Sequence, residues 1–413
     1  MAIVVDIFRW AEILVFAFLF FSALYLLIFG LAGMFRYRPA PANLANREQR
    51  KVAVLIPGYK EDNVILETAT EALKQDYPSH LFDVYVIADS FGEVTLAKLR
   101  TMDLRVVEVV FEKSSKAKAL NLALSRIPGD YDVVVILDAD NLMEPGFLRH
   151  INDAFDRGFK AVQGHRVAKN MNTRFARLDA ISEEVNNNIF REGHRVLGLS
   201  SALIGSGMAF DFNLFREQMS HVTAHGEDKE LEMRLLGAGI RIEYLPEALV
   251  LDEKIQHQEV FARQRKRWLA AQFAMFRQYA GAGLLQLLTR GNLDLFDKVI
   301  QMVLPPRLLL LGVATLLAAL AITLGLIPAT AGMMTVPSWL YALLLLATAT
   351  AILVSVPGKH YSRETLKAIG SLPGAFLVMF SLLFRLRGAG KTFIHTPHGT
   401  TQPVNPEKDE NRH

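Results

Sequence analysis

Three long uncharged apolar stretches constrain this 413-residue chain more than any other feature. The first runs for 21 residues, 13–33, close to the ~20 that an α-helix needs to cross the hydrocarbon core of a bilayer. The other two, residues 308–327 and 338–356, are joined by an uncharged loop that contains prolines and a glycine. This pattern predicts a helical hairpin, and the sequence as a whole predicts an integral membrane protein.

The charges around the first stretch predict its orientation. Asp6, Arg9 and Glu12 precede it, whereas a cleaved secretory signal, the alternative interpretation, would have a basic leader and an apolar run of only ~7 to 15 residues. Arg36 and Arg38 follow it directly, and basic residues mark the cytoplasmic side of a span. We therefore expect a bacterial-type inner or plasma membrane protein whose soluble segment is cytoplasmic.

A fourth apolar segment, residues 368–384, is shorter and contains a Pro-Gly pair. If it crossed the membrane, Arg385, Arg387 and Lys391 would lie outside, against the charge rule. A re-entrant or interfacial helix is therefore preferred, and a fourth span is the alternative. The charged, proline-containing tail, 401–413, is predicted to be disordered.

Composition excludes several kinds of chemistry. The chain has no cysteine, which excludes a disulfide framework, a thiolate nucleophile and a Cys-type metal site. Its net charge of +3 is small and its basic residues form no tract, so nucleic acid is not a predicted partner. Carboxylates, amines, hydroxyls and imidazoles remain available.

Between the apolar stretches, the segment 50–255 alternates β-branched runs with helical patterns. The runs are strand-length and nearly continuous, which is typical of strands buried on both faces: 51–56, 84–88, 106–110 and 133–137. The helical patterns lie at 64–74, 93–100, 117–125 and 146–157. This order predicts an α/β fold with a mainly parallel sheet, whose ligands bind at the carboxyl ends of the strands.

Asp138 and Asp140 directly follow the fourth predicted strand. Two carboxylates at i and i+2 can converge on Mg²⁺ or Mn²⁺, which would hold one or two protein carboxylates and take further oxygens from a diphosphate. An acidic turn at the end of a strand is the alternative.

Weaker candidates lie elsewhere along this segment. Asp89 follows the second strand and could grip a base or ribose, or simply cap a helix. Lys116 begins a predicted helix, where the dipole disfavours a cation unless an anion lies nearby; a solvated lysine is the alternative. Gly205, Ser206 and Gly207 permit close approach of the backbone to a ligand, although glycine-rich turns are common.

Two further groups precede the hairpin. Glu227 and Asp228 begin a helix, where they could be ordinary dipole partners or supply a general base. The sequence Gln264-Arg265-Lys266-Arg267-Trp268 lies in an amphipathic segment and could be an interfacial anchor. Guanidinium groups also fit diphosphate oxygens, and a tryptophan face can support a sugar ring.

Taken together and in order, these motifs resemble a known family. Asp89, Asp138-Ala139-Asp140, Glu227-Asp228 and Gln264-x-x-Arg267-Trp268 are similar to the D, DxD, ED and QxxRW series of membrane-bound family 2 glycosyltransferases, such as cellulose, hyaluronan and poly-N-acetylglucosamine synthases. The resemblance covers roughly residues 50–310. It departs from the pattern at Gly226, where threonine is frequent, and after Asp89, where a second aspartate is common. These departures leave the donor sugar open.

The resemblance implies a GT-A (Rossmann-like) catalytic domain that binds a nucleotide-sugar, with UDP as the expected nucleotide. The residues implied in nucleotide binding are Tyr59, Glu61, Asp89, Lys116, Asp138, Gln264, Arg265 and Arg267. Asp138 and Asp140 would bind the metal, and Asp228, with Glu227 beside it, would be the general base. The acceptor site would comprise Trp268, Gly205, Ser206 and Gly207.

The implied reaction is an inverting, metal-dependent transfer of a sugar to a growing polysaccharide at the cytoplasmic face, with a lipid acceptor as the alternative. The bilayer, a second copy of the chain and secretion proteins are the expected partners. A non-catalytic scaffold or sugar sensor is a different class of hypothesis, against which the complete set of carboxylates argues. A transporter is disfavoured because the spans contain no charged pair.

The predicted organisation has six parts. They are an N-terminal transmembrane helix (1–38), a cytosolic GT-A domain (39–255), interfacial amphipathic helices (256–304), a transmembrane hairpin (305–357), a basic linker with a further membrane-associated helix (358–400) and the tail (401–413).

Overall fold

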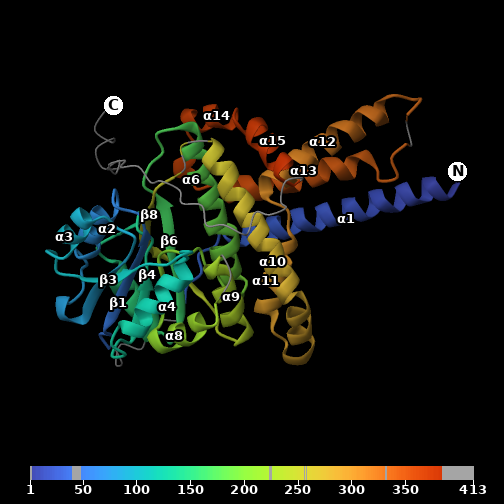
Figure 1. Cartoon of the computed structure of the whole chain (residues 1–413). Coiled ribbons are helices and arrows are strands. Elements are labelled where there is room, and N and C mark those ends of the chain that lie inside the picture. The colour runs from blue at the N-terminus through green and yellow to red at the C-terminus, as the bar shows by residue number, and fades with distance from the viewer. Residues whose placement is uncertain are drawn as a thin grey trace.

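The computed structural model describes residues 2–39, 48–222, 226–254, 256, 258–330 and 333–383. They form an α/β part and a group of apolar helices that projects from it (Figure 1). The predicted disordered tail lies outside the described residues.

The α/β part is built on one eight-stranded sheet in the order β3-β2-β1-β4-β7-β6-β8-β5. The strands are β1 Val52–Tyr59, β2 Phe82–Asp89, β3 Arg105–Val109, β4 Val133–Ile136, β5 Leu142–Met143, β6 Ala161–Ala168, β7 Met208–Asp211 and β8 Glu243–Asp252. Strands β1 to β4 pair in parallel, β7 is antiparallel to β4 and β6, and β8 runs parallel to β6. The sheet is therefore mixed, and the predicted GT-A-like α/β class is confirmed.

Helices cover both faces of the sheet because the strands bury side chains on both sides. In β1, Ala53 and Leu55 join one apolar cluster, whereas Val52 and Val54 join the other. The first cluster includes residues of α4 Lys116–Arg126, α8 Phe212–Ser220 and α9 Glu227–Gly237, and the second those of α2 Ile65–Ala72, α3 Glu93–Leu99 and α5 Phe147–Asp156. Strand and helix positions predicted up to residue 157 are confirmed to within a few residues.

Three longer helices, α6 Arg174–Asn187, α10 Gln258–Arg290 and α11 Leu293–Val303, join the sheet to the apolar group. Helix α6 continues into a π-helical turn, Asn188–Gly193, and α7 His194–Val196. Helices α10 and α11 pack against each other and against α9. Short 3-10 turns occur at Ser79–Leu81 and Gly358–His360.

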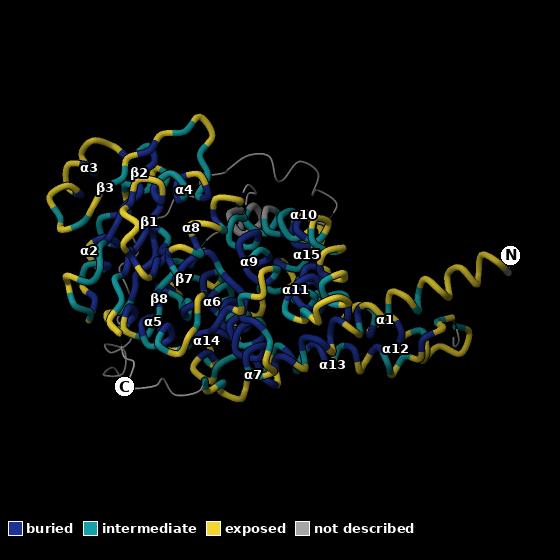
Figure 2. Tube along the Cα trace, turned by 90° about the horizontal axis from the view of Figure 1, so that it is seen from below, coloured by how far each residue is buried: buried dark blue, intermediate teal, exposed yellow. Residues whose placement is uncertain are grey.

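The apolar group contains α1 Ala2–Ala32, α12 Arg307–Leu326 and α13 Ser338–Val354. They pack side by side around a separate apolar cluster (Figure 2). Among the described residues, two helices are long and apolar enough to cross a membrane, Ile3–Ala32 and Arg307–Leu326. The third predicted span is a helix of only 17 residues, shorter than the ~20 expected of a crossing helix.

The fourth apolar segment is broken rather than straight. Helices α14 Arg363–Ile369 and α15 Leu372–Leu383 meet at an angle of 41°. This geometry suits either a broken span or a re-entrant segment, so the preference for a re-entrant helix stays a prediction. Helix α15 packs against α10 and α12.

Candidate active site

The carboxyl ends of β1 and β2 bring the first group of predicted residues together. Tyr59 lies opposite Asp89 in the parallel register of these strands. Asp89 is buried and accepts hydrogen bonds from Ser90 Oγ at 3.0 Å and from Ser114 Oγ. Helix α3 begins after Gly92, so the alternative that Asp89 caps a helix is wrong. These hydrogen bonds instead hold its carboxylate at the carboxyl end of β2.

Lys116 begins helix α4 and is neutralised by carboxylates. Its Nζ lies 2.5 Å from Asp138 Oδ1 and 3.6 Å from Glu227 Oε1, and it donates to the Gly205 carbonyl at 2.6 Å. Burial alone would lower the pKa of Lys116, but the carboxylates outweigh it and raise the pKa above its ordinary value. The alternative of a solvated lysine is therefore wrong. The ammonium stays charged and joins three motifs that are far apart in the sequence.

Asp138 and Asp140 follow β4 and are held by a buried polar network. The amide of Asp138 donates to Ser206 Oγ at 2.9 Å. With its amide oriented to satisfy both ends of the side chain, Asn141 accepts from Ser206 at 2.7 Å and donates to Asp140 and Asp252, each at 3.0 Å. The network places the carboxylate of Asp252, at the end of β8, beside that of Asp140.

These oxygens suit a hard divalent cation. Among the described residues, no three His, Asp or Glu side chains converge as a complete metal cage. Mg²⁺ and Mn²⁺ do not need one, since they keep water or substrate phosphates in their coordination shell. Asp138 is paired with Lys116, and Asp140 lies beside Asp252, so the carboxylates that could hold such an ion stand together at one side of the cavity.

The start of α9 forms another wall. Burial raises the pKa of Glu227, the charge of Lys116 opposes this rise, and Asp228 adds to it. The helix follows Gly226, whose φ of +114° is readily adopted by glycine and would strain a threonine. Asp228 faces Gly205 across the site.

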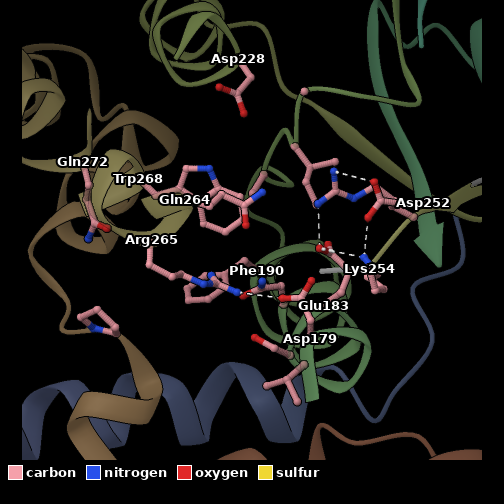
Figure 3. A pocket seen from close by; sticks show the side chains of 18 of the residues that line it. Asp179, Glu183, Phe190, Asp228, Asp252, Lys254, Gln264, Arg265, Trp268 and Gln272 are labelled. Atoms are coloured by element: carbon pink, nitrogen blue, oxygen red, sulfur yellow. Dashed lines mark hydrogen bonds and ion pairs between the residues drawn. The ribbon is translucent and has the colours of Figure 1, made fainter. Parts of the chain in front are cut away.

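Helix α10 supplies the remaining predicted residues. The guanidinium of Arg265 stacks on the ring of Trp268, 4.5 Å from its centroid, and pairs with Asp179 of α6 at 3.1 Å. Figure 3 shows Gln264, Arg265 and Trp268 pointing from α10 toward the space bounded by Asp228 and the opposite wall. Arg267 belongs to α10, but its side chain lies outside the described residues.

A single cavity of about 1390 Å³ unites these groups. The predicted site residues that line it are Tyr59, Glu61, Asp89, Lys116, Asp138, Asp140, Gly205, Glu227, Asp228, Gln264, Arg265 and Trp268. Ser206 and Gly207 do not line it, and the hydroxyl of Ser206 is fully buried beneath the loop. The structure thus places Ser206 as a support for Asp138 rather than as a contact for an acceptor.

Sequence reasoning missed a second set of charged residues that line the same cavity. They are Arg166, Asp179, Glu183, Arg191, Asp252, Lys254 and Arg307. Only Asp252 had a usable signal, because it ends an apolar run, Leu249-Val250-Leu251, as Asp138 does. The others lie inside helical or mixed segments where nothing in the local pattern indicates a cavity.

We expect Glu183→Gln to destabilise the fold at neutral pH. Burial would raise the pKa of Glu183, but Arg166, Lys254 and Arg191 outweigh it and hold the pKa at about 2 instead of 4.5. The stabilisation is therefore present above pH 4.5 and is lost as the pH falls from 4.5 to about 2. Removing one partner of a buried ion pair costs about 3 to 5 kcal/mol.

Thermal unfolding of both proteins at pH 7 and at pH 3 would check this. The difference in melting temperature should be large at pH 7 and shrink at pH 3. Glu71→Gln, which breaks an exposed pair with Lys74, is the control and should melt like the parent at both values. Equal destabilisation of the Glu183 variant at both pH values would contradict the expectation.

We expect Gly205→Ala to reduce activity through Asp228. Gly205 has a φ of +89°, and a Cβ there would make an ordinary van der Waals contact with Asp228 Oδ2, at 3.6 Å, and fill space beside this carboxylate in the cavity. The matched control is Gly239→Ala, where φ is +76° and nothing lies within 4 Å of the added atom. Both variants should lose about 1 kcal/mol of stability from backbone strain, but only the first should lose catalytic rate. Equal rates in the two variants would show that Gly205 has no special place in the site.

The mixed α/β sheet, with carboxylates clustered at the carboxyl ends of its strands, is of the GT-A-like class found in glycosyltransferases. Residues 49–271 match the family described as "Glycosyltransferase like family 2". This match covers more than half of the chain, which therefore belongs to that family.

Similar curated proteins are glycosyltransferases of bacteria. "Probable glycosyltransferase YdaM" of Bacillus subtilis is 26% identical over 239 residues, which cover 54% of this chain and 55% of the relative. "N-acetylglucosaminyltransferase" of Sinorhizobium fredii is 29% identical over 292 residues, 66% of this chain and 68% of the relative. The protein of the same name from Rhizobium meliloti is 28% identical over 345 residues, which cover 78% of this chain and 73% of the relative. The chain thus spans about half the length of the Bacillus relative and more of the other two.

Solved structures to which the chain is similar include "Mannosyltransferase PcManGT from Pyrobaculum calidifontis in complex with GDP-Man and Mn2+". The TM-score is 0.49 at 19% identity, covering 83% of this chain and 98% of the other. Staphylococcus aureus TarS 1-349 in complex with UDP-GlcNAc has a TM-score of 0.38 at 15% identity, covering 79% and 92%.

Proposed function

We propose that this chain transfers a sugar from a UDP-linked donor to an acceptor hydroxyl, with inversion at the anomeric carbon and with Mg²⁺ or Mn²⁺ as cofactor. The observation that carries the proposal is that Asp89, Asp140, Asp228 and Trp268 line one cavity. Relatives named N-acetylglucosaminyltransferases support N-acetylglucosamine as the first sugar to test.

Each wall of the cavity has a proposed task. Tyr59, Glu61 and Asp89 would hold the uracil and ribose at the ends of β1 and β2, and Lys116 would lie near the diphosphate. Gln264, Arg265 and Arg267 are proposed to face the diphosphate from α10. A divalent ion held by Asp140 and Asp138 would stabilise the negative charge that develops on the leaving group.

Proton transfer is proposed to depend on Asp228. The pKa of an acceptor hydroxyl is far above neutral, so the hydroxyl needs a base as it attacks the anomeric carbon. The new carbon–oxygen bond forms while the bond to the diphosphate breaks, the proton passes to the Asp228 carboxylate, and the electron pair leaves on UDP. Attack opposite the leaving group inverts the centre without a covalent enzyme intermediate.

For the acceptor, a growing polysaccharide is the first candidate, because the QxxRW motif resembles that of processive synthases. A lipid acceptor is the second, and a specific observation favours it. The cavity continues between the apolar helices, where Leu311, Ile352 and Met379 line it. We propose that α1 and α12 lie in the membrane with the catalytic part on the cytoplasmic side, as Arg36 and Arg38 predict.

The test is to incubate full-length protein in lipid nanodiscs with radiolabelled UDP-sugars and either ion, and then to size the product. A ladder or high-molecular-mass product supports polymerisation, and one lipid-soluble product supports single transfer. Protein that releases no UDP with any donor, with or without added acceptors, would instead support a non-catalytic scaffold.

A further inference from the structure

Two guanidinium groups that line the cavity, those of Arg265 and Arg191, each have a carboxylate nearby. Arg265 pairs with Asp179 at 3.1 Å. Arg191, buried at the π-helical turn, lies 3.8 Å from Glu183. Glu183 also pairs with Arg166 of β6 at 2.8 Å and with Lys254 at 3.8 Å. Its single negative charge is therefore divided among three cations (Figure 3).

A third guanidinium group, that of Arg307, lines the same cavity, where the charges of the other two repel it and that of Glu183 attracts it. It donates to the backbone oxygen and the hydroxyl of Ser182 at 3.0 Å and 3.2 Å, and it forms no ion pair with a described carboxylate. Its Nη1 is buried and, among the described residues, has no hydrogen-bond partner. A buried guanidinium nitrogen without a hydrogen-bond partner is costly, and the carboxylate that attracts Arg307, Glu183, is paired with other cations, so this position favours an anion.

Arg307 also lies where the charged lining of the cavity gives way to an apolar lining. It is the first residue of α12, whose helix dipole adds positive potential there. Beyond it the lining is hydrocarbon from α12, α13 and α15: Leu308, Leu311, Ile352, Leu353, Ala375 and Met379. Sugar hydroxyls would lose hydrogen bonds against these side chains, whereas an alkyl or isoprenoid chain would not.

We propose that this wall binds the phosphate of a lipid-linked acceptor, with the phosphate at Arg191 and Arg307 and the hydrocarbon chain between α12, α13 and α15. The inference rests on the proposed function, because the saccharide or hydroxyl that the lipid carries is presented to Asp228. Guanidinium groups bind phosphate oxygens bidentately, which suits a phosphate that faces two of them. The attached saccharide can be one sugar or many, so either product is compatible.

Dodecyl phosphate is the probe, and Trp268 reports its binding because its ring lies against Arg265. The chain has three tryptophans, and the other two, Trp10 and Trp339, are exposed on α1 and α13. Replacing both with phenylalanine leaves Trp268 as the single tryptophan, which is excited selectively at long wavelength. The full chain in phosphatidylcholine nanodiscs is then titrated with dodecyl phosphate, dodecanol and inorganic phosphate below micellar concentrations.

We expect saturable binding of dodecyl phosphate, and binding of dodecanol and of inorganic phosphate that is weaker by roughly 10-fold or more. Arg307→Gln keeps a hydrogen-bond donor for Ser182 and should weaken the binding of dodecyl phosphate by roughly 10- to 100-fold. Arg307→Lys keeps the positive charge and should retain part of the affinity. Arg149→Gln, which breaks an exposed pair with Asp76, is the matched control and should bind like the parent.

Three outcomes would overturn the inference. Dodecanol binding as tightly as dodecyl phosphate would leave only an apolar groove. Inorganic phosphate binding as tightly would remove the role of the lipid chain. Displacement of dodecyl phosphate by UDP with Mn²⁺ would assign the cations to the donor.

This titration uses no sugar donor, so its result is independent of catalysis. If Asp228→Asn left sugar transfer intact, the proposed function would fail, whereas the binding curves would be unchanged. If transfer required Asp228 but Arg307→Gln altered neither the dodecyl phosphate affinity nor the KM for a lipid acceptor, only the inference would fail.

Discussion

Asp228→Asn is expected to lower the rate of sugar transfer by about 100- to 10,000-fold, the range that a general base contributes. Asparagine occupies the same space at the start of α9 and cannot accept a proton from the attacking hydroxyl. The fold should be little affected, because Asp228 lines the cavity rather than the core. The measurement is the initial rate of UDP release with saturating donor and acceptor.

Donor binding separates this effect from a general defect. The KM for the nucleotide-sugar should change little, because the proposed donor contacts lie on other elements. Glu71→Gln, which alters an exposed carboxylate that does not line the cavity, is the control and should retain most of the rate. A variant at Asp228 with near-normal transfer would mean that another group takes the proton, and neighbouring Glu227 would be the first to test.

Asp140→Asn is expected to remove most of the metal-dependent rate. A bound divalent ion contributes several kcal/mol of charge stabilisation, and each 1.4 kcal/mol corresponds to about tenfold in rate, so a loss of roughly 100-fold or more is expected. Asp140 is buried beside Asn141, which donates to it and to Asp252 at 3.0 Å each. The asparagine variant therefore keeps the shape of the site and loses a charge.

Binding of UDP as a function of Mn²⁺ concentration provides a readout besides activity. In the parent protein, affinity for UDP should rise with the ion, and in the Asp140 variant this dependence should weaken. Asp103→Asn, an exposed aspartate between α3 and β3, is the control. A parent enzyme that is fully active with excess chelator would contradict the metal role, whatever the variant does.

The sequence predicted the first half of the α/β part well because its signals are local. Strands buried on both faces have nearly continuous apolar runs, and each run ends where a polar residue such as Asp89 or Asp138 begins. The second half was harder. Strand β8 carries Pro246 and Glu247, which interrupt its apolar pattern, so both the strand and Asp252 at its end were missed.

Alternatives left open by single motifs were decided by neighbours distant in the chain. Lys116 could have been a solvated residue until Asp138 and Glu227 were seen to contact it. Ser206 was predicted to contact an acceptor, yet its buried hydroxyl accepts a hydrogen bond from the backbone amide of Asp138. The side chains of adjacent residues in a turn point in different directions, so a motif alone cannot say which of them faces the cavity.

The sequence by itself determined the fold class, the strand ends that line the cavity, and the apolar helices, because periodicity and strand ends are properties of neighbouring residues. Only the tertiary structure decided that one cavity runs from the carboxylates of β1, β2 and β4 to the apolar helices. The contact between Arg307 and Ser182 spans 125 positions in the chain. Such convergence depends on packing between whole elements, and no local pattern encodes it.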